Sequence, residues 1–126
     1  MKITKEICRV ALVQAEPVLF DKGACVDKTI KYIEEAANNK AELIVFPELF
    51  IPGYPIGMNF GFSMGKRTAE GRVDWKRYYD ASMCVGDEEF LRLAETAKNA
   101  CAYVSIGFSE QDDVSVEVIQ VFHQQI

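Results

Sequence analysis

The chain of 126 residues has the length of one small domain, and its 49% hydrophobic residues are ample for a core, which excludes a disordered protein. Its formal net charge of -5 argues against nucleic-acid binding, because phosphate recognition needs a basic surface. Four cysteines lie far apart without a CxxC pair, which predicts reduced thiols in place of a zinc site or a disulfide framework.

The first predicted element is a strand over Ile7 to Ala15, the segment ICRVALVQA. Its apolar residues are nearly continuous, which predicts burial along most of the strand, with Cys8 packed inside it. Charged and polar residues interrupt the wider N-terminal segment, so its apolar part is too short to span a bilayer, and it has no small-residue cleavage site. We therefore expect a soluble, cytoplasmic protein.

A helix and a second strand follow, and together they predict a βαβ unit. Apolar residues recur at helical spacing from Val26 to Ala37, and Asn38 and Asn39 suit the helix end. The continuous apolar run Leu43 to Phe46 is typical of a strand buried on both faces. Pro47 ends it, because proline cannot donate to a sheet ladder. The order strand, helix, strand predicts parallel pairing with a right-handed crossover.

Two further helices and a third strand are predicted in the second half of the chain. One helix is expected behind a cap at Asp74, and we interpret its aromatic stripe as packing. That stripe comprises Trp75, Tyr78, Tyr79 and Met83. The next helix is expected behind Asp87, with acidic residues in its first turn and apolar residues at helical spacing as far as Ala97. The segment AYVSIGF predicts the third strand, whereas the alternation of valines that begins at Val114 breaks at Ile119.

Glu48 is the candidate functional residue. It follows the predicted strand Leu43 to Phe46, and active groups commonly lie past the carboxyl ends of parallel strands. Bulky apolar residues flank it in FPELFIPGYP, and a carboxylate in apolar surroundings tends to have its pKa raised toward the range of a general base. Acidic residues are also common where strands meet water, so a solvated loop carboxylate is the alternative, and the residues alone leave both open.

Four segments together resemble the nitrilase superfamily of carbon–nitrogen hydrolases, over roughly Arg9 to Glu110. They are VALVQAEP, AELIVFPELFIPGYP, FGFSMGKRTAEGRVDWKRYYDASM and YVSIGFSE. FPELFIPGYP is the most specific of them, and the pattern from Phe60 to Tyr79 resembles the nitrilase branch. The resemblance implies an α/β fold, the N-terminal portion of an α-β-β-α sandwich, in a homo-oligomer. We expect one incomplete domain over residues 1–126, with a tail at 111–126 that diverges from the family.

The resemblance also implies a mechanism and residue roles. Glu48 aligns with the family's general base, and Tyr54 falls in the loop that often lines the substrate pocket in relatives, although a packing role for this tyrosine stays open. A cysteine thiolate attacks the nitrile carbon, the carboxylate takes the thiol proton, and a lysine ammonium stabilises the developing charge. Ammonia leaves, and water activated by the carboxylate hydrolyses the thioester. No metal or organic cofactor is required.

The lysine and the cysteine of the family lie downstream of the segment GFSE, but no lysine follows Lys98 and no cysteine follows Cys101 here. We interpret the four cysteines as small hydrophobic residues and His123 as a surface or terminal residue. Two hypotheses remain. The chain is the N-terminal part of a nitrilase and is inactive alone, or it is a non-catalytic product that associates with full-length relatives. Either predicts exposed apolar area, unpaired strand edges and an oligomeric or poorly soluble chain.

Overall fold

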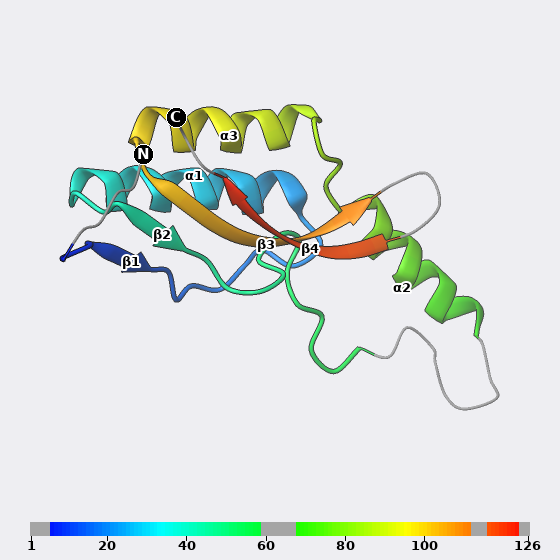
Figure 1. Cartoon of the computed structure of the whole chain (residues 1–126). Helices are drawn as coiled ribbons and strands as arrows, with labels where there is room; N and C mark the ends of the chain where they lie inside the picture. Colours follow the sequence, from blue (N-terminus) through cyan, green and yellow to red (C-terminus); the bar gives the residue numbers. More distant parts are fainter. Residues whose placement is uncertain (1–5, 59–67, 112–115, 124–126) are drawn as a thin grey trace.

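The computed structural model describes residues 6–58 and 68–111 and the backbone of 116–123. Its elements are β1 (Val10–Leu12), α1 (Lys22–Asn38), β2 (Leu43–Val45), α2 (Ala69–Asp80), α3 (Glu88–Ala100), β3 (Tyr103–Gln111) and β4 (Val116–His123). The described strands form a sheet in the order β1-β2-β3-β4, parallel from β1 to β3 and antiparallel between β3 and β4. Helices α1 and α3 pack side by side over one face of this sheet (Figure 1).

The predicted βαβ unit is confirmed. Strand β1 pairs with β2 in parallel, and β2 pairs with β3 in parallel, so that Val10, Leu43 and Tyr103 lie in one row across the sheet. Helix α1 begins behind Asp21, whose side chain accepts a hydrogen bond from the Ala24 amide at 2.9 Å. The helix ends at Asn38 with Asn39 as its cap, where the sequence predicts the end.

The predicted start of α3 is also confirmed. The Asp87 carboxylate accepts hydrogen bonds from the Phe90 amide at 2.7 Å and from the Cys84 amide at 3.0 Å. Its Oδ2 also lies 3.5 Å from Lys22 Nζ, which joins the first turns of α1 and α3. This cap therefore fixes two helices at once.

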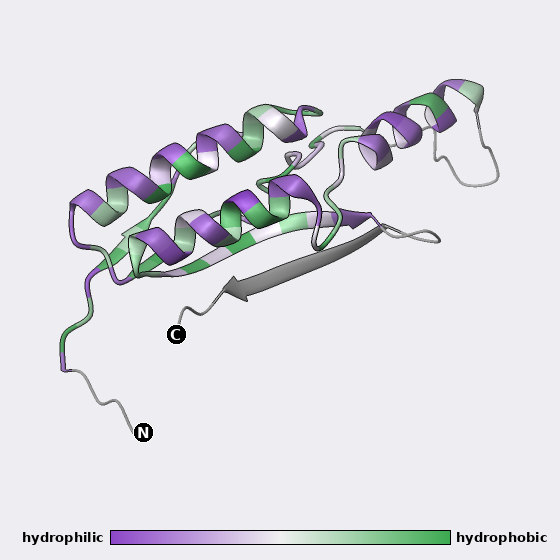
Figure 2. Cartoon of the chain, turned by 90° about the horizontal axis from the view of Figure 1, so that it is seen from above, coloured by the Kyte–Doolittle hydropathy of each residue, from purple (hydrophilic) through white to green (hydrophobic). Residues whose placement is uncertain are grey.

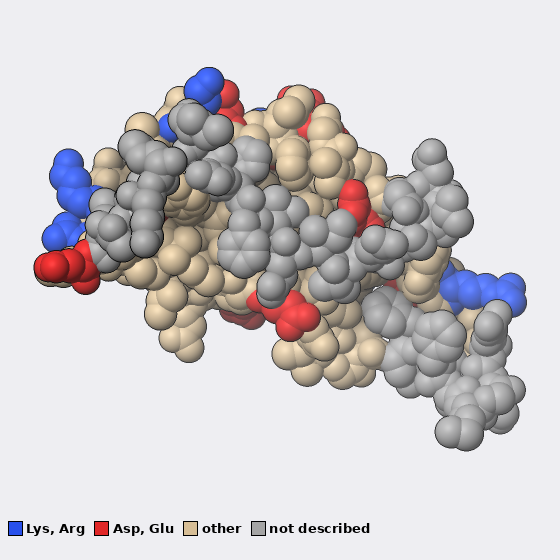
Figure 3. All heavy atoms as spheres, viewed as in Figure 1, with Lys and Arg blue, Asp and Glu red and all other residues tan. Residues whose placement is uncertain are grey.

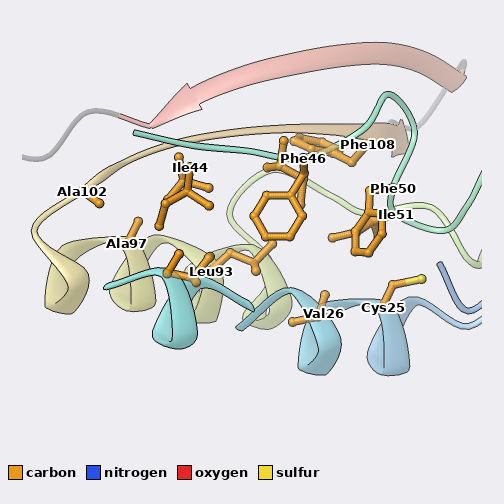
Figure 4. Packing of buried hydrophobic residues seen from close by; sticks show 14 of the residues in the cluster. Cys25, Val26, Ile44, Phe46, Phe50, Ile51, Leu93, Ala97, Ala102 and Phe108 are labelled. Atoms are coloured by element: carbon orange, nitrogen blue, oxygen red, sulfur yellow. The ribbon is translucent and has the colours of Figure 1, made fainter. Parts of the chain in front are cut away.

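The core lies between the sheet and these two helices. Figure 2 shows hydrophobic residues recurring along the helices, and Figure 4 shows buried side chains from α1, α3, β2 and β3 meeting in one layer. Side chains point alternately to the two faces of a strand, and this decides which residues join the layer. Ile44 and Phe46 are 0% and 5% exposed, whereas Leu43 and Val45, which alternate with them, are only half-buried. The largest side chains of the layer are Phe50, Phe108, Ile33, Ile44, Ile51 and Met83.

Burial on both faces of the first two strands was expected and is wrong. In β1, Val10 is 45% exposed and Leu12 is 77% exposed, and Cys8 lies exposed before the strand. The cause is the single helical layer: a strand covered on one face buries every second residue only. The side chains of β1, β2 and β3 on the opposite face form what we call the open sheet face. It comprises Val10, Leu12, Leu43, Val45 and Tyr103.

The predicted cap of α2 is corrected by the structure. The helix begins behind Thr68, whose hydroxyl accepts a hydrogen bond from the Gly71 amide at 3.1 Å, and Asp74 lies within the helix. Met83 lies beyond the end of the helix and is fully buried beside β3, where its amide donates to the Ser109 carbonyl at 2.9 Å. Trp75 is 45% exposed and stacks on Tyr79 with ring centroids 5.2 Å apart, so it packs on its neighbour in the stripe and lies outside the core.

The last strand crosses the break in alternation at Ile119, because backbone pairing with β3 needs no strict alternation of side chains. His123 ends β4, and its side chain lies outside the described residues. Within the described ranges no helix has the length and apolarity needed to span a bilayer. In the view of Figure 3, lysine and arginine side chains lie toward the ends of the molecule and acidic ones are scattered, some of them beside the basic ones at the left end, so this face carries no single charged patch in the described part.

Candidate active site

Glu48 lies just past the carboxyl end of β2, as the sequence predicts. The Phe46 amide still pairs with the Ser105 carbonyl of β3 at 2.8 Å, and the chain then leaves the sheet. It returns at Ile51, whose amide lies 3.4 Å from the Gly107 carbonyl and whose carbonyl accepts from the Ser109 amide at 2.9 Å. Glu48 is therefore held in a short excursion that β3 fixes at both ends.

Gly107 of β3 allows this excursion to lie close to the strand. A Cβ at this position would lie 2.7 Å from the Leu49 nitrogen and 2.9 Å from Glu48 Cα. Both neighbours are backbone atoms, which cannot rotate away as the end of a side chain can. Leu49 itself has φ of 48°, in the left-handed region that non-glycine residues rarely adopt. The backbone at Glu48 and Leu49 is therefore tightly constrained.

The expected apolar surroundings of the Glu48 carboxylate are absent in the described chain. Glu48 is exposed, whereas Leu49, Phe50 and Ile51 are buried at 7%, 1% and 0% exposure. Phe50 packs in the core with its ring centroid 5.4 Å from that of Phe46. The apolar neighbours thus turn inward while the carboxylate points outward, and the described residues alone do not desolvate it. Its role as general base stays a prediction.

Tyr54 follows the excursion and leads into a second turn. Its side chain is 54% exposed, which counts against the packing alternative and leaves its role in substrate binding a prediction. The Ile56 amide donates to the Tyr54 carbonyl at 2.8 Å, and the Met58 amide donates to the Pro55 carbonyl at 3.1 Å. We call residues 54–58 the Tyr54 turn. It follows Gly53, whose φ of 105° suits glycine.

Sequence reasoning missed a buried polar cluster beneath this turn, because it interpreted Tyr78 as packing alone. The Tyr78 hydroxyl donates to the Gly53 carbonyl at 3.1 Å and bonds to the Ser109 hydroxyl. Ser82 Oγ lies 2.9 Å from both the Ser109 hydroxyl and the Tyr78 carbonyl oxygen. Burial raises the pKa of Tyr78, with the Ser109 bond opposing this and Tyr54 adding to it, so the phenol stays protonated and able to donate. The only sequence signal is a tyrosine and a serine four residues apart.

The four cysteines do not gather at Glu48. Cys25 is fully buried in α1, where its thiol donates to the Val18 carbonyl at 3.1 Å and burial raises its pKa, so it behaves as the small core residue that was expected. Cys84 is half-buried between α2 and α3. Cys8 and Cys101 are exposed, against expectation, and precede β1 and β3, so they lie at the opposite end of the parallel strands from Glu48.

A metal centre is not built by the described residues, among which no group of three or more histidine, cysteine, aspartate or glutamate side chains could hold an ion. The arrangement that remains is a single exposed carboxylate past the end of a parallel strand, on a backbone that β3 holds rigidly. Such a group can accept a proton from a partner brought to it.

Two solved structures share the fold. The glutamine-dependent NAD⁺ synthetase of Cytophaga hutchinsonii superposes with a TM-score of 0.56 at 21% identity, covering 93% of this chain and 17% of that one. The corresponding enzyme of Acinetobacter baumannii gives a TM-score of 0.56 at 24% identity, covering 93% of this chain and 19% of that one. At this level of identity the likeness concerns the fold alone.

Curated relatives at higher identity are nitrilases. An aliphatic nitrilase of Sinorhizobium fredii is 45% identical over 82% of this chain and 34% of its own length. A bifunctional nitrilase/nitrile hydratase of Lupinus angustifolius is 40% identical over 90% of this chain and 33% of its own. The chain thus spans about a third of the length of these relatives. The carbon-nitrogen hydrolase family model matches residues 9–125, and the chain belongs to this family.

Proposed function

We propose that this chain is the part of a nitrilase-like hydrolase that supplies the general base, with Glu48 in that role. The reaction would convert a nitrile to a carboxylic acid and ammonia through a cysteine thioester. The observation that carries the proposal is the rigid excursion past β2, which presents one carboxylate to solvent beside β3. The nitrilase relatives, which match 82 to 90% of this chain, support the choice of substrate class.

Glu48 needs partners that the described residues do not place beside it. In the mechanism that the resemblance implies, the carboxylate takes a proton from a cysteine thiol and a lysine stabilises the charge that develops on the substrate. The carboxylate is exposed here, so such groups can approach it from outside the described chain. A general base contributes about 10²–10⁴-fold only when its proton donor is within reach, so we propose that the chain is inactive alone.

A chimera tests this proposal. Residues 1–110 of this chain, joined to the remainder of the Lupinus angustifolius relative, should restore a complete set of catalytic groups. We expect the chimera to release ammonia from nitriles, and the 126-residue chain to release none above a protein-free blank. Glu48→Gln in the chimera keeps the shape of the side chain but removes the base, and should reduce turnover to background. A chimera that melts cooperatively but releases no ammonia would contradict the proposal.

A second candidate is a non-catalytic chain that associates with full-length relatives. The open sheet face favours it, because Val10 and Leu12 of β1 and Tyr103 of β3 expose 45%, 77% and 45% of their surface on the two sides of β2. Association through this face should be detected by sedimentation as an assembly larger than one chain. Leu12→Lys should then shift the chain toward the monomer, whereas Leu91→Lys, at an exposed position on α3, should not. A monomer at all concentrations would exclude this candidate.

A further inference from the structure

The buried hydroxyl of Tyr78 reaches the loop that carries both candidate site residues. Its ring belongs to α2, yet its oxygen lies 3.1 Å from the carbonyl oxygen of Gly53, 25 residues earlier. Gly53 lies between the part of the loop that pairs with β3, which ends at Ile51, and the Tyr54 turn. A hydrogen bond at Gly53 therefore acts at the junction between the part that presents Glu48 and the part that presents Tyr54.

The junction is enclosed on its other side by the segment before α1. The Phe20 amide donates to the Pro52 carbonyl at 3.0 Å, and the Phe20 ring meets the Tyr78 ring edge-on with centroids 5.9 Å apart. A Cβ on Gly53 would lie only 2.9 Å from a side-chain carbon of Leu19. Gly53 is thus wedged between Leu19 and the Tyr78 hydroxyl, and the direction in which the chain leaves it depends on both.

The Tyr78 hydroxyl is itself held in place. The Ser109 hydroxyl bonds to it and lies 2.9 Å from Ser82 Oγ, and both serines are fully buried. Ser109 belongs to β3, the strand whose Gly107 and Ser105 hold the two ends of the Glu48 excursion. Hydrogen bonds through Tyr78 and Ser109 therefore connect the start of the Tyr54 turn to β3, the same strand that fixes Glu48.

We propose that Tyr78 is a positioning residue that sets the Tyr54 turn relative to Glu48 through the Gly53 carbonyl. Glu48 is fixed by β3 without Tyr78, since the bonds of Phe46 and Ile51 do not involve it. Loss of the hydroxyl therefore releases the Tyr54 turn and leaves Glu48 in place. The consequence for substrate binding rests on the proposed function, whereas the positioning itself does not.

Hydrogen exchange in the 126-residue chain tests the positioning without any activity. In Tyr78→Phe the amides of Ile56 and Met58, which close the Tyr54 turn, should exchange about five- to tenfold faster than in the parent. The amide of Ser109, bonded to Ile51, should be unchanged. Thr29→Val is the matched control, because it removes a buried hydroxyl whose bond to the Cys25 carbonyl lies within α1. Equal exchange at Ile56 and Met58 in parent and Tyr78→Phe would overturn the proposal, as would acceleration of the same size at Ser109.

Kinetics in the chimera described above separate the two proposals. Tyr78→Phe should raise KM severalfold with kcat nearly retained, because the turn that would bind substrate moves and the base does not. A change in kcat alone, with KM unaltered, would show that Tyr78 does not act through the Tyr54 turn. An inactive chimera would count against the proposed function, while the exchange of Ile56 and Met58 would still decide the positioning role.

Discussion

Replacing Gly107 by alanine is the most direct test of how the fold holds Glu48. The new Cβ would lie 2.7 Å from the Leu49 nitrogen, so the backbone must retreat by about 0.7 Å to reach ordinary contact at 3.4 Å. The Ile51 bond to the Gly107 carbonyl is already 3.4 Å long, and this retreat would break it. Overpacking costs about 1–3 kcal/mol and a lost hydrogen bond about 1 kcal/mol, so we expect a loss of about 2–4 kcal/mol.

Thermal and urea unfolding measure this cost. For a domain of this size, 1 kcal/mol corresponds to roughly 4 °C, so Gly107→Ala should lower Tm by about 8–16 °C. In NMR spectra the largest shifts should fall on the amides of Glu48 and Leu49. Gly23→Ala is the control, because its Cβ would meet only an Asp21 oxygen at 3.8 Å, and alanine favours the helix by up to about 1 kcal/mol. If Gly107→Ala is as stable as the parent, the backbone at Glu48 is not constrained by β3 and the argument for a rigid excursion fails.

Two further predictions concern α1 and α3. Burial raises the pKa of Cys25, so the unfolded thiol loses its proton first, and stability that is full below about pH 8.5 should fall as the pH rises, by up to about 1.4 kcal/mol per unit. Urea titrations from pH 7.5 to 9.5 should show this slope, and Cys25→Ala should remove it; an unchanged slope would assign it to another group. Asp87→Ala removes the acceptor for two amides and should cost about 1–2 kcal/mol in the same titration, whereas Asp80→Ala, on an exposed ion pair, should cost under about 0.5 kcal/mol. Equal losses for the two aspartates would contradict the capping role.

The parts of the fold that the sequence predicts well are those decided by local chemistry. The start of α3 follows from Asp87, because its carboxylate accepts the Phe90 amide of the first turn, a local bond that depends on sequence spacing alone. The parallel order of β1, β2 and β3 follows from the helices between them. The cap of α2 is the counterexample. Thr68 and Asp74 are both competent caps, and the structure begins the helix at Ala69, behind Thr68.

The position of Glu48 was predictable, but the cluster that supports its loop was not. Glu48 follows an apolar strand and a proline, and its position at the edge of the sheet can be predicted from the sequence because the carboxyl ends of parallel strands meet at one edge. The bond from Tyr78 to Gly53 joins residues 25 apart through a buried hydroxyl, and no periodicity or spacing signals it. The role of Gly107 was not predictable either. In the sequence it is a glycine within an apolar strand, and the reason for a glycine there is the close approach of the Glu48 backbone.

Both errors about burial have one physical cause, and it bears on where the function resides. Apolar sequence shows that a residue can be buried, but not that a partner is present to cover it. The flanks of Glu48 and the residues of β1 are equally apolar, and in each case the helical layer covers one side and leaves Glu48 and Leu12 exposed. The layer that would cover the open sheet face, like the catalytic partners that the proposed function needs, has to come from outside the described chain, and Leu12→Lys should weaken any association through that face.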